Sequence, residues 1–117
     1  MGVTVLTVKM GNKNYDTRSA SNGIVPNFVH SMDGSHLCLT INEFNGQILP
    51  IHDSFATHPS DVDAMNEALR KTFADMYKAY DINDFLTFNE VDTEEYEAPP
   101  QGNLDLDSVL TAQFMFC

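Results

Sequence analysis

An apolar stripe at helical spacing, beginning just after Pro59, is the feature that most restricts the folds open to this sequence. Its large apolar side chains recur every three or four residues: Val62, Met65, Leu69, Phe73, Met76, Tyr77 and Tyr80. Such a period predicts an amphipathic helix. Ser60 can cap its first turn, and Asp61 and Asp63 favour the positive end of the helix dipole. We therefore expect a helix over residues 60–80, with an apolar face that must pack on another element.

A β-hairpin is expected directly before that helix. A short apolar run (QILPI) leads into His52-Asp53-Ser54, and a second short run (FATH) follows. Two extended pieces around a polar break predict a hairpin over residues 47–58, with Asp53 at or near its tip. Pro50 restricts the first strand to an edge position or a bulge, because proline donates no ladder hydrogen bond.

The first 46 residues predict strands followed by a helix. The alternating, β-branched run TVLTVK indicates a strand, and a weaker return strand would make residues 1–22 a strand pair. In residues 23–46, Pro26 disfavours helical conformation at the residue before it, so we expect extended chain there. A helix then begins near Ser31 or Asp33 and ends at Asn45-Gly46.

Residues 81–117 read as an acidic, Pro-containing loop, a short helix in the run LDLDSVL and an aromatic tail, FMFC. Together the elements predict an α+β fold, with β-hairpins and one long amphipathic helix in a single unit over residues 1–117. The length, 117 residues with 43% hydrophobic residues, suits one globular domain.

The charge balance argues against independent binding of nucleic acid. The chain has 17 Asp and Glu against 6 Lys and Arg, a formal net charge of −11, and acidic surfaces repel phosphates. Its two cysteines, Cys38 and Cys117, form neither a disulfide framework nor a metal-binding spacing, which predicts reduced thiols and a cytoplasmic location. No apolar run approaches the roughly 20 residues that span a bilayer, so no membrane partner is expected.

The unit IHDSF, residues 51–55, carries the most informative chemistry. A strand that delivers an aspartate to a hairpin tip presents a hard oxygen ligand, as phosphoryl transfer with magnesium requires. Two metal ions clamp the reacting oxygens in polymerases, so at least one further carboxylate must come from elsewhere. A hydrolase triad of His52, Asp53 and Ser54 is excluded by geometry, because neighbouring strand residues point to opposite faces. From the pentapeptide alone, Asp53 shaping a turn is the simpler alternative.

A wider resemblance supports the metal-binding interpretation. Three blocks occur in order, PNFVHSMDGSHL, LPIHDSFATHPSDVDAMNEALRKTFADMY and GNLDLDSVLTAQFMFC. Residues 23–117 thereby resemble the carboxyl-terminal region of the single-subunit DNA-dependent RNA polymerases of phages and mitochondria. The resemblance implies a palm-subdomain fragment in which Asp53 binds the catalytic Mg²⁺ and His52 lies beside the metal. It also implies that His30 is associated with the RNA–template base pair, and that Phe114 and Phe116 belong to a carboxyl-terminal foot near the active site.

The implied function is template-directed RNA synthesis from ribonucleoside triphosphates. The fingers helix and the first palm aspartate have no counterpart here, so we expect the chain to be inactive alone. Its partners would be the remaining polymerase fragment and, through it, DNA template, RNA and nucleotides. A split polymerase and a truncated gene remnant both fit. A bacteriophage origin is expected, and a phage-encoded chain would be located in the cytoplasm of the host cell.

Two alternatives stay open at this point. A piece of a related family A DNA polymerase would share the hairpin but usually carries Glu after His-Asp, where this chain has Ser54. A non-enzymatic acidic module, such as an inhibitor that mimics nucleic-acid charge, would suit the net charge of −11. It does not account for the ordered HDSF and PNFVHS blocks.

Overall fold

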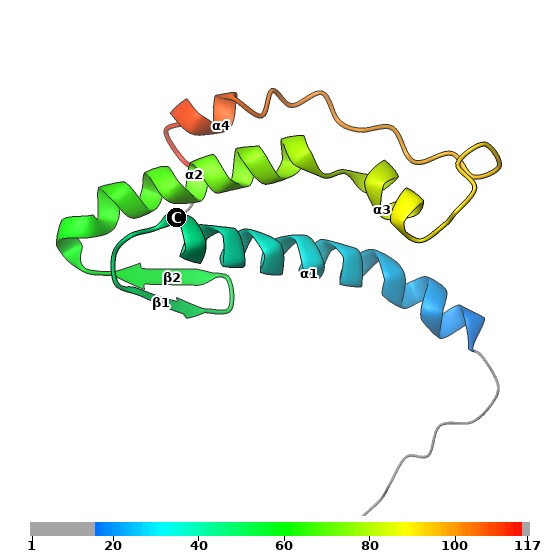
Figure 1. The fold of residues 1–117 in the computed structure, drawn as a ribbon, viewed down its shortest axis with the longest axis horizontal. Coiled ribbons are helices and arrows are strands. Elements are labelled where there is room, and N and C mark those ends of the chain that lie inside the picture. Colours follow the sequence, from blue (N-terminus) through cyan, green and yellow to red (C-terminus); the bar gives the residue numbers. More distant parts are fainter. Residues whose placement is uncertain (1–15, 116–117) are drawn as a thin grey trace, which may run out of the picture. The chain divides into compact units, whose positions relative to one another are not determined.

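The structure is a computed structural model that describes residues 16–115. The elements follow in the order α1 (Thr17–Glu43), β1 (Ile48–Ile51), β2 (Ser54–Thr57), η1 (Pro59–Asp61), α2 (Val62–Ala79), α3 (Ile82–Phe88) and α4 (Ser108–Thr111) (Figure 1). This mixture of helices with an antiparallel hairpin confirms the expected α+β class and its long helix. None of the described helices has both the length and the apolarity to cross a bilayer.

Helix α1 differs from the expectation for residues 16–43. The weak strand expected up to residue 22 and the extended segment expected around Pro26 are both helical, so these predictions were wrong. Proline in a helix interior costs about 3 kcal/mol, a local penalty that helix on both sides can offset. Asp16 also caps the helix, since its carboxylate accepts hydrogen bonds from the backbone N–H (3.0 Å) and hydroxyl (2.8 Å) of Ser19. The strand expected over residues 4–9 lies outside the described residues.

The chain divides into two compact units, residues 1–31 and residues 32–117, with the boundary inside α1. One unit was expected from the sequence. A 27-residue helix is about 40 Å long, longer than the core of a small unit, so its two halves can belong to different groups of contacts.

The hairpin of β1 and β2 forms with the expected tip. The strands pair antiparallel, with Ile48 opposite Thr57 and Ile51 opposite Ser54, which leaves His52 and Asp53 as the two-residue loop. Side chains alternate between a partly buried and an exposed face along both strands, as strand geometry requires. Pro50 is tolerated because a two-stranded sheet consists of edge strands.

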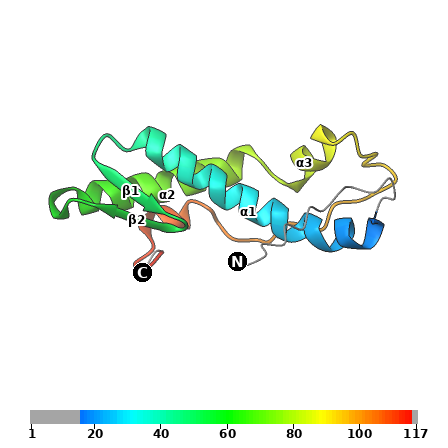
Figure 2. The ribbon, with the colours of Figure 1, turned by 90° about the horizontal axis from the view of Figure 1, so that it is seen from below.

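Helix α2 carries the core of the second unit. Its buried residues Met65, Ala68 and Leu69 cluster with Phe44, and Ile48 and Phe55 of the hairpin pack against this group. Figure 2 shows the hairpin beside α2 and the end of α1. The apolar stripe of α2 thus packs against the hairpin and Phe44, as expected. Val62 at the start of the stripe is 51% exposed.

Buried polar contacts join α1 to α2. The His36 ring nitrogen Nε2 lies 3.0 Å from the Leu69 carbonyl oxygen, and the hydroxyls of Thr40 and Thr72 lie 2.9 Å apart. His36, Thr40 and Thr72 are all buried. We call the four residues of these two contacts, His36, Leu69, Thr40 and Thr72, the polar seam. Buried polar groups with satisfied partners favour one arrangement of the helices, because a shift of α1 along α2 would break the hydrogen bonds between them.

The segment after α2 is more ordered than expected. Where the sequence suggested a loop, α3 forms, and Asp81 caps it through a capping box with Asp84. The short helix expected over residues 104–110 is present as α4, displaced toward the carboxyl end. Arg70 of α2 holds α4 by donating to the carbonyl oxygens of Val109 (2.8 Å) and Ala112 (2.6 Å).

Candidate functional site

The hairpin tip presents the Asp53 carboxylate outward. Asp53 is exposed, and it is the second residue of the loop that the Ile51–Ser54 pair closes. The strands on either side are held in register, so the carboxylate stands at the end of a supported element rather than in the middle of a long loop. Such a position suits a ligand that must reach a cation beyond the surface of its own domain.

His52 has an unusual backbone conformation, with φ at 55°. Two-residue hairpin loops use turns with positive φ at the first loop residue, where glycine, asparagine or aspartate is usually found. A non-glycine residue with positive φ carries strain of roughly 1–3 kcal/mol, and such residues concentrate at functional sites. The histidine side chain is therefore kept next to Asp53 at a conformational cost.

Asp53 suits one ligand of a metal centre, but its described neighbours do not complete that centre. Within residues 16–115, no three side chains of the His, Cys, Asp and Glu types lie close enough together to hold a metal ion. An exposed carboxylate oxygen is the donor that Mg²⁺ prefers, and Mg²⁺ is commonly bound through one or two carboxylates with water and phosphate oxygens. The chemistry of the donor fits, and the remaining ligands would come from outside the described residues.

Phe55, two residues after Asp53, anchors the hairpin on its inner face. It packs against the core, and its ring lies edge-on to His36, with centroids 6.3 Å apart and planes at 66°. His36 also meets Phe73 of α2 edge-on, at 5.5 Å and 85°. Sequence reasoning overlooked His36. The sequence signal for His36 is its spacing, because Met32, His36 and Thr40 recur every four residues. The structure shows that all three are buried.

Three further side chains are expected at the site, those of His30, Phe114 and Phe116. His30 is exposed on α1 and belongs to the unit of residues 1–31, whereas His52 and Asp53 belong to the other unit. Phe114 is 77% exposed after α4, and Phe116 lies outside the described residues. The roles expected for His30 and for the foot therefore stay predictions.

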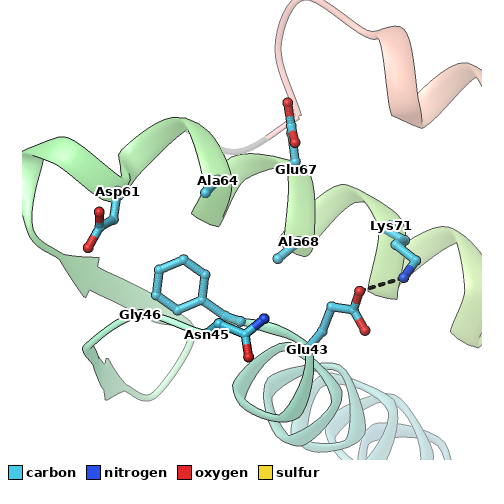
Figure 3. A pocket seen from close by; sticks show the side chains of 9 residues that line it. Glu43, Asn45, Gly46, Asp61, Ala64, Glu67, Ala68 and Lys71 are labelled. Atoms are coloured by element: carbon cyan, nitrogen blue, oxygen red, sulfur yellow. Dashed lines mark hydrogen bonds and ion pairs between the residues drawn. The ribbon is translucent and has the colours of Figure 1, made fainter.

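A groove of about 470 Å³ lies at the base of the hairpin, at the end away from Asp53. Figure 3 shows Asp61 and Glu67 on its rim and the ion pair between Glu43 and Lys71. The groove was not foreseen, since its residues come from distant parts of the sequence. Of the carboxylates that line the groove, that of Glu43 is already paired with Lys71. The described residues of the groove form no metal cluster.

Gly46 allows this end of the core to close. A Cβ atom placed at Gly46 would stand 2.5 Å from a ring carbon of Phe44, closer than real Cβ atoms approach. The buried Phe44 ring therefore folds back over the glycine. Asn45-Gly46 follows the end of α1, as the sequence predicts, and the structure adds this requirement for close approach.

Comparison with known proteins relates the whole hairpin region to one family. Residues 2–97 match the family model described as DNA-dependent RNA polymerase. The match includes His30, His52 and Asp53. This chain therefore belongs to the DNA-dependent RNA polymerase family.

Individual relatives agree with the family match. The chain is 38% identical over 97 residues to the DNA-directed RNA polymerase 1A of Nicotiana tabacum, with 78% of this chain and 63% of the relative aligned. It is 33% identical over 118 residues to the mitochondrial DNA-directed RNA polymerase 1 of Arabidopsis thaliana, covering 96% of this chain and 12% of the relative. The mitochondrial DNA-directed RNA polymerase 1 of Nicotiana sylvestris is covered over 10% of its length. The chain thus spans less than two thirds of the first relative and about a tenth of the others.

Proposed function

We propose that this chain is the part of a DNA-directed RNA polymerase that supplies Asp53 as a ligand of the catalytic Mg²⁺. The observation that carries the proposal is the exposed Asp53 carboxylate at the tip of a two-residue hairpin loop, within a segment that matches the polymerase family. The rest of the catalytic machinery belongs to sequence outside these 117 residues, in the same or a second polypeptide.

Asp53, His52 and Phe55 of the hairpin have different roles in this proposal. Asp53 binds and orients the cation, whose charge offsets the negative charge on the transferring phosphoryl group. His52 sets the direction of the loop through its positive φ, and as the neighbour of Asp53 it would lie beside the bound metal. Phe55 holds the hairpin on the core. Catalysis of phosphoryl transfer depends mostly on such positioning, because the protein has little covalent chemistry to perform.

The proposed partners are the remaining polymerase sequence and, through it, DNA template, RNA and nucleoside triphosphates. A net charge of −11 repels phosphate backbones, so the basic surface that holds nucleic acid is assigned to that remaining sequence. The outer face of the hairpin suits contact with it, because Leu49 and Ile51 are 60% and 58% exposed. We expect the chain alone to show no RNA synthesis.

His30 and the carboxyl-terminal foot complete the proposed site in the assembled enzyme. His30 would approach the RNA–template base pair, and Phe114 and Phe116 would pack near the active site. The exposure of His30 and Phe114 is compatible with contacts that form on assembly. A palm subdomain and a phage origin are likewise proposals. The relatives named here are plant proteins, two of them mitochondrial by name, and the expected cytoplasmic location stays a prediction.

Substitution of Asp53 tests the proposal. The 117-residue chain, mixed with a purified fragment that carries the remaining polymerase sequence, should transcribe a template with Mg²⁺. Asp53→Asn keeps the shape of the side chain but removes its charge. Substitutions in the second shell of metal sites already cost 10–100-fold, so we expect loss of a direct ligand to lower the rate at least about 100-fold. The matched control is Asp75→Asn, an exposed aspartate on α2, which should leave the rate within about twofold.

The same experiment distinguishes the remaining alternative. An acidic mimic of nucleic acid would tolerate Asp53→Asn, because one charge in a net −11 matters little. Full activity of the Asp53→Asn mixture, with both pieces folded, would therefore refute the metal-ligand role. The DNA polymerase alternative is set aside by the family match.

A further inference from the structure

His36 is a buried histidine at the point where α1, the hairpin and α2 meet. Its side chain is 7% exposed. Its Nε2 lies 3.0 Å from the Leu69 carbonyl oxygen, and its ring lies edge-on to Phe55 and Phe73. Nothing in the proposed function uses this residue, although histidine is seldom placed in a core without a specific partner.

The hydrogen bond fixes the orientation of the ring. A carbonyl oxygen only accepts hydrogen bonds, so Nε2 must carry a proton and donate to Leu69. This bond holds the imidazole at a set position on α2, and aromatic pairs favour the edge-to-face geometry that the ring then makes with Phe55. The consequence is a direct mechanical link from α2 to the second strand of the hairpin.

The hairpin depends on such a link. An isolated two-stranded hairpin is marginally stable in water, and here the outer face is exposed. Phe55 is the large aromatic side chain on the inner face, two residues from Asp53. A site that binds metal must hold its ligands within about 0.5 Å of the productive geometry. Loss of the His36–Phe55 contact would leave the tip less well directed.

We propose that His36 is a positioning residue that directs the hairpin, and through it the Asp53 carboxylate, toward the metal position. The inference rests on the proposed function for the role of Asp53. The hold of His36 on the hairpin itself does not depend on that function and can be measured on this chain alone.

Thr40 provides a matched control one helical turn further along α1. It is fully buried, and its hydroxyl pairs with that of Thr72 in the same polar seam. Its side-chain hydrogen bond is made to α2. Thr40→Val and His36→Leu should therefore both weaken the packing of α1 on α2, whereas His36→Leu alone should loosen the hairpin.

Amide hydrogen exchange in the full 117-residue chain tests the structural half. Relative to α2 amides of the same variant, hairpin amides should exchange about tenfold faster in His36→Leu and at the unsubstituted rate in Thr40→Val. If His36→Leu does not fold, His36→Phe takes its place, because it keeps a ring against Phe55 but loses the donor; it should raise the relative rate about threefold. Equal relative rates in all folded variants would overturn the proposal.

Magnesium dependence tests the functional half in the reconstituted enzyme with saturating complementary fragment. His36→Leu should raise the Mg²⁺ concentration for half-maximal rate about fivefold or more, and Thr40→Val should leave it unchanged. An unchanged Mg²⁺ requirement in His36→Leu, or equal increases in both variants, would refute the positioning role. Full activity of Asp53→Asn would instead refute the proposed function, whatever the exchange data show for His36.

Discussion

At the scale of single residues, the hairpin tip combines a strained backbone with an exposed acid. His52 has φ at 55°, and Asp53 follows it directly. Glycine would adopt this backbone at no steric cost, yet the chain has an imidazole there. The effects of the strain and of the side chain can be separated by experiment. The strain lowers the free energy of unfolding, whereas the imidazole contributes to the transcription rate.

His52→Gly should relieve the strain while removing the imidazole. We expect the free energy of unfolding to stay level or rise by up to about 1 kcal/mol, since relief of positive-φ strain outweighs the entropic cost of glycine. Chemical denaturation of the 117-residue chain measures this change. In the reconstituted enzyme the same variant should lower the transcription rate.

A loss of stability in His52→Gly would contradict the strain argument, and an unchanged rate would contradict the role of His52 beside the metal. His58→Gly is unsuitable as a control, because His58 bonds the Gln47 side chain. His52→Asn is a suitable control for loss of the imidazole, because asparagine also tolerates positive φ.

At the scale of elements, a capping residue decides where α3 begins after α2. Asp81 accepts from the backbone N–H groups of Asn83 (2.7 Å) and Asp84 (3.1 Å), and the Asp84 side chain accepts from the Asp81 N–H in return. Helix α3 has few residues and no buried side chain, so its formation depends on this local network rather than on core packing.

The capping box makes α3 sensitive to acid. The hydrogen bond from Asp84, then that from Asn83, holds the pKa of Asp81 below its ordinary value of 3.8. Because the pKa is lower in the folded state, the stabilisation is complete above the ordinary value and is lost as pH falls through the lowered pKa. We expect α3 amides to exchange faster at about pH 2 than at about pH 5, after correction for intrinsic rates.

Asp81→Asn provides the control for this pH dependence. Asparagine caps helices as well as aspartate but does not titrate in this range. Its α3 amides should show no acid-dependent change beyond that of α2. A carboxyl titration by NMR that placed the Asp81 pKa at or above 3.8 would contradict the assignment.

At the scale of the whole molecule, the carboxyl-terminal segment is held on α2 by cationic side chains. Arg70 is partly buried and donates to Val109 and Ala112, while Lys78 forms an ion pair with Asp107. Hydrogen bonds from a charged donor contribute about 1.5–3 kcal/mol, whereas an exposed ion pair contributes about 0–1 kcal/mol. Arg70 is therefore the main tether of the proposed foot.

Arg70→Met should release this segment while keeping the packing of the aliphatic part of the side chain. We expect limited proteolysis within residues 100–115 to accelerate about tenfold, the ratio that corresponds to about 1.4 kcal/mol. Lys78→Met, its matched control, should accelerate cleavage about twofold at most. Equal sensitivity of the two variants would contradict the dominant role of Arg70.

The α2 helix and the hairpin with Asp53 at its tip could be predicted from the sequence, because their signals are local. Helical spacing, strand length and a polar break act over a few residues and need no distant partner. The family resemblance then pointed to Asp53 through three ordered blocks. The acidic composition, with a net charge of −11, already argued against independent binding of nucleic acid.

Only the tertiary structure decided the course of α1 through Pro26 and the place of His36. In α1, the context of helix on both sides overrides the local preference of the residue before proline. His36 reads as one polar residue among several until Leu69 and Phe55, which lie 33 and 19 residues further along the chain, are brought to its ring. Contacts between residues so far apart in the chain leave no local pattern in the sequence. The contacts that hold the Asp53 hairpin are therefore seen only in the folded structure.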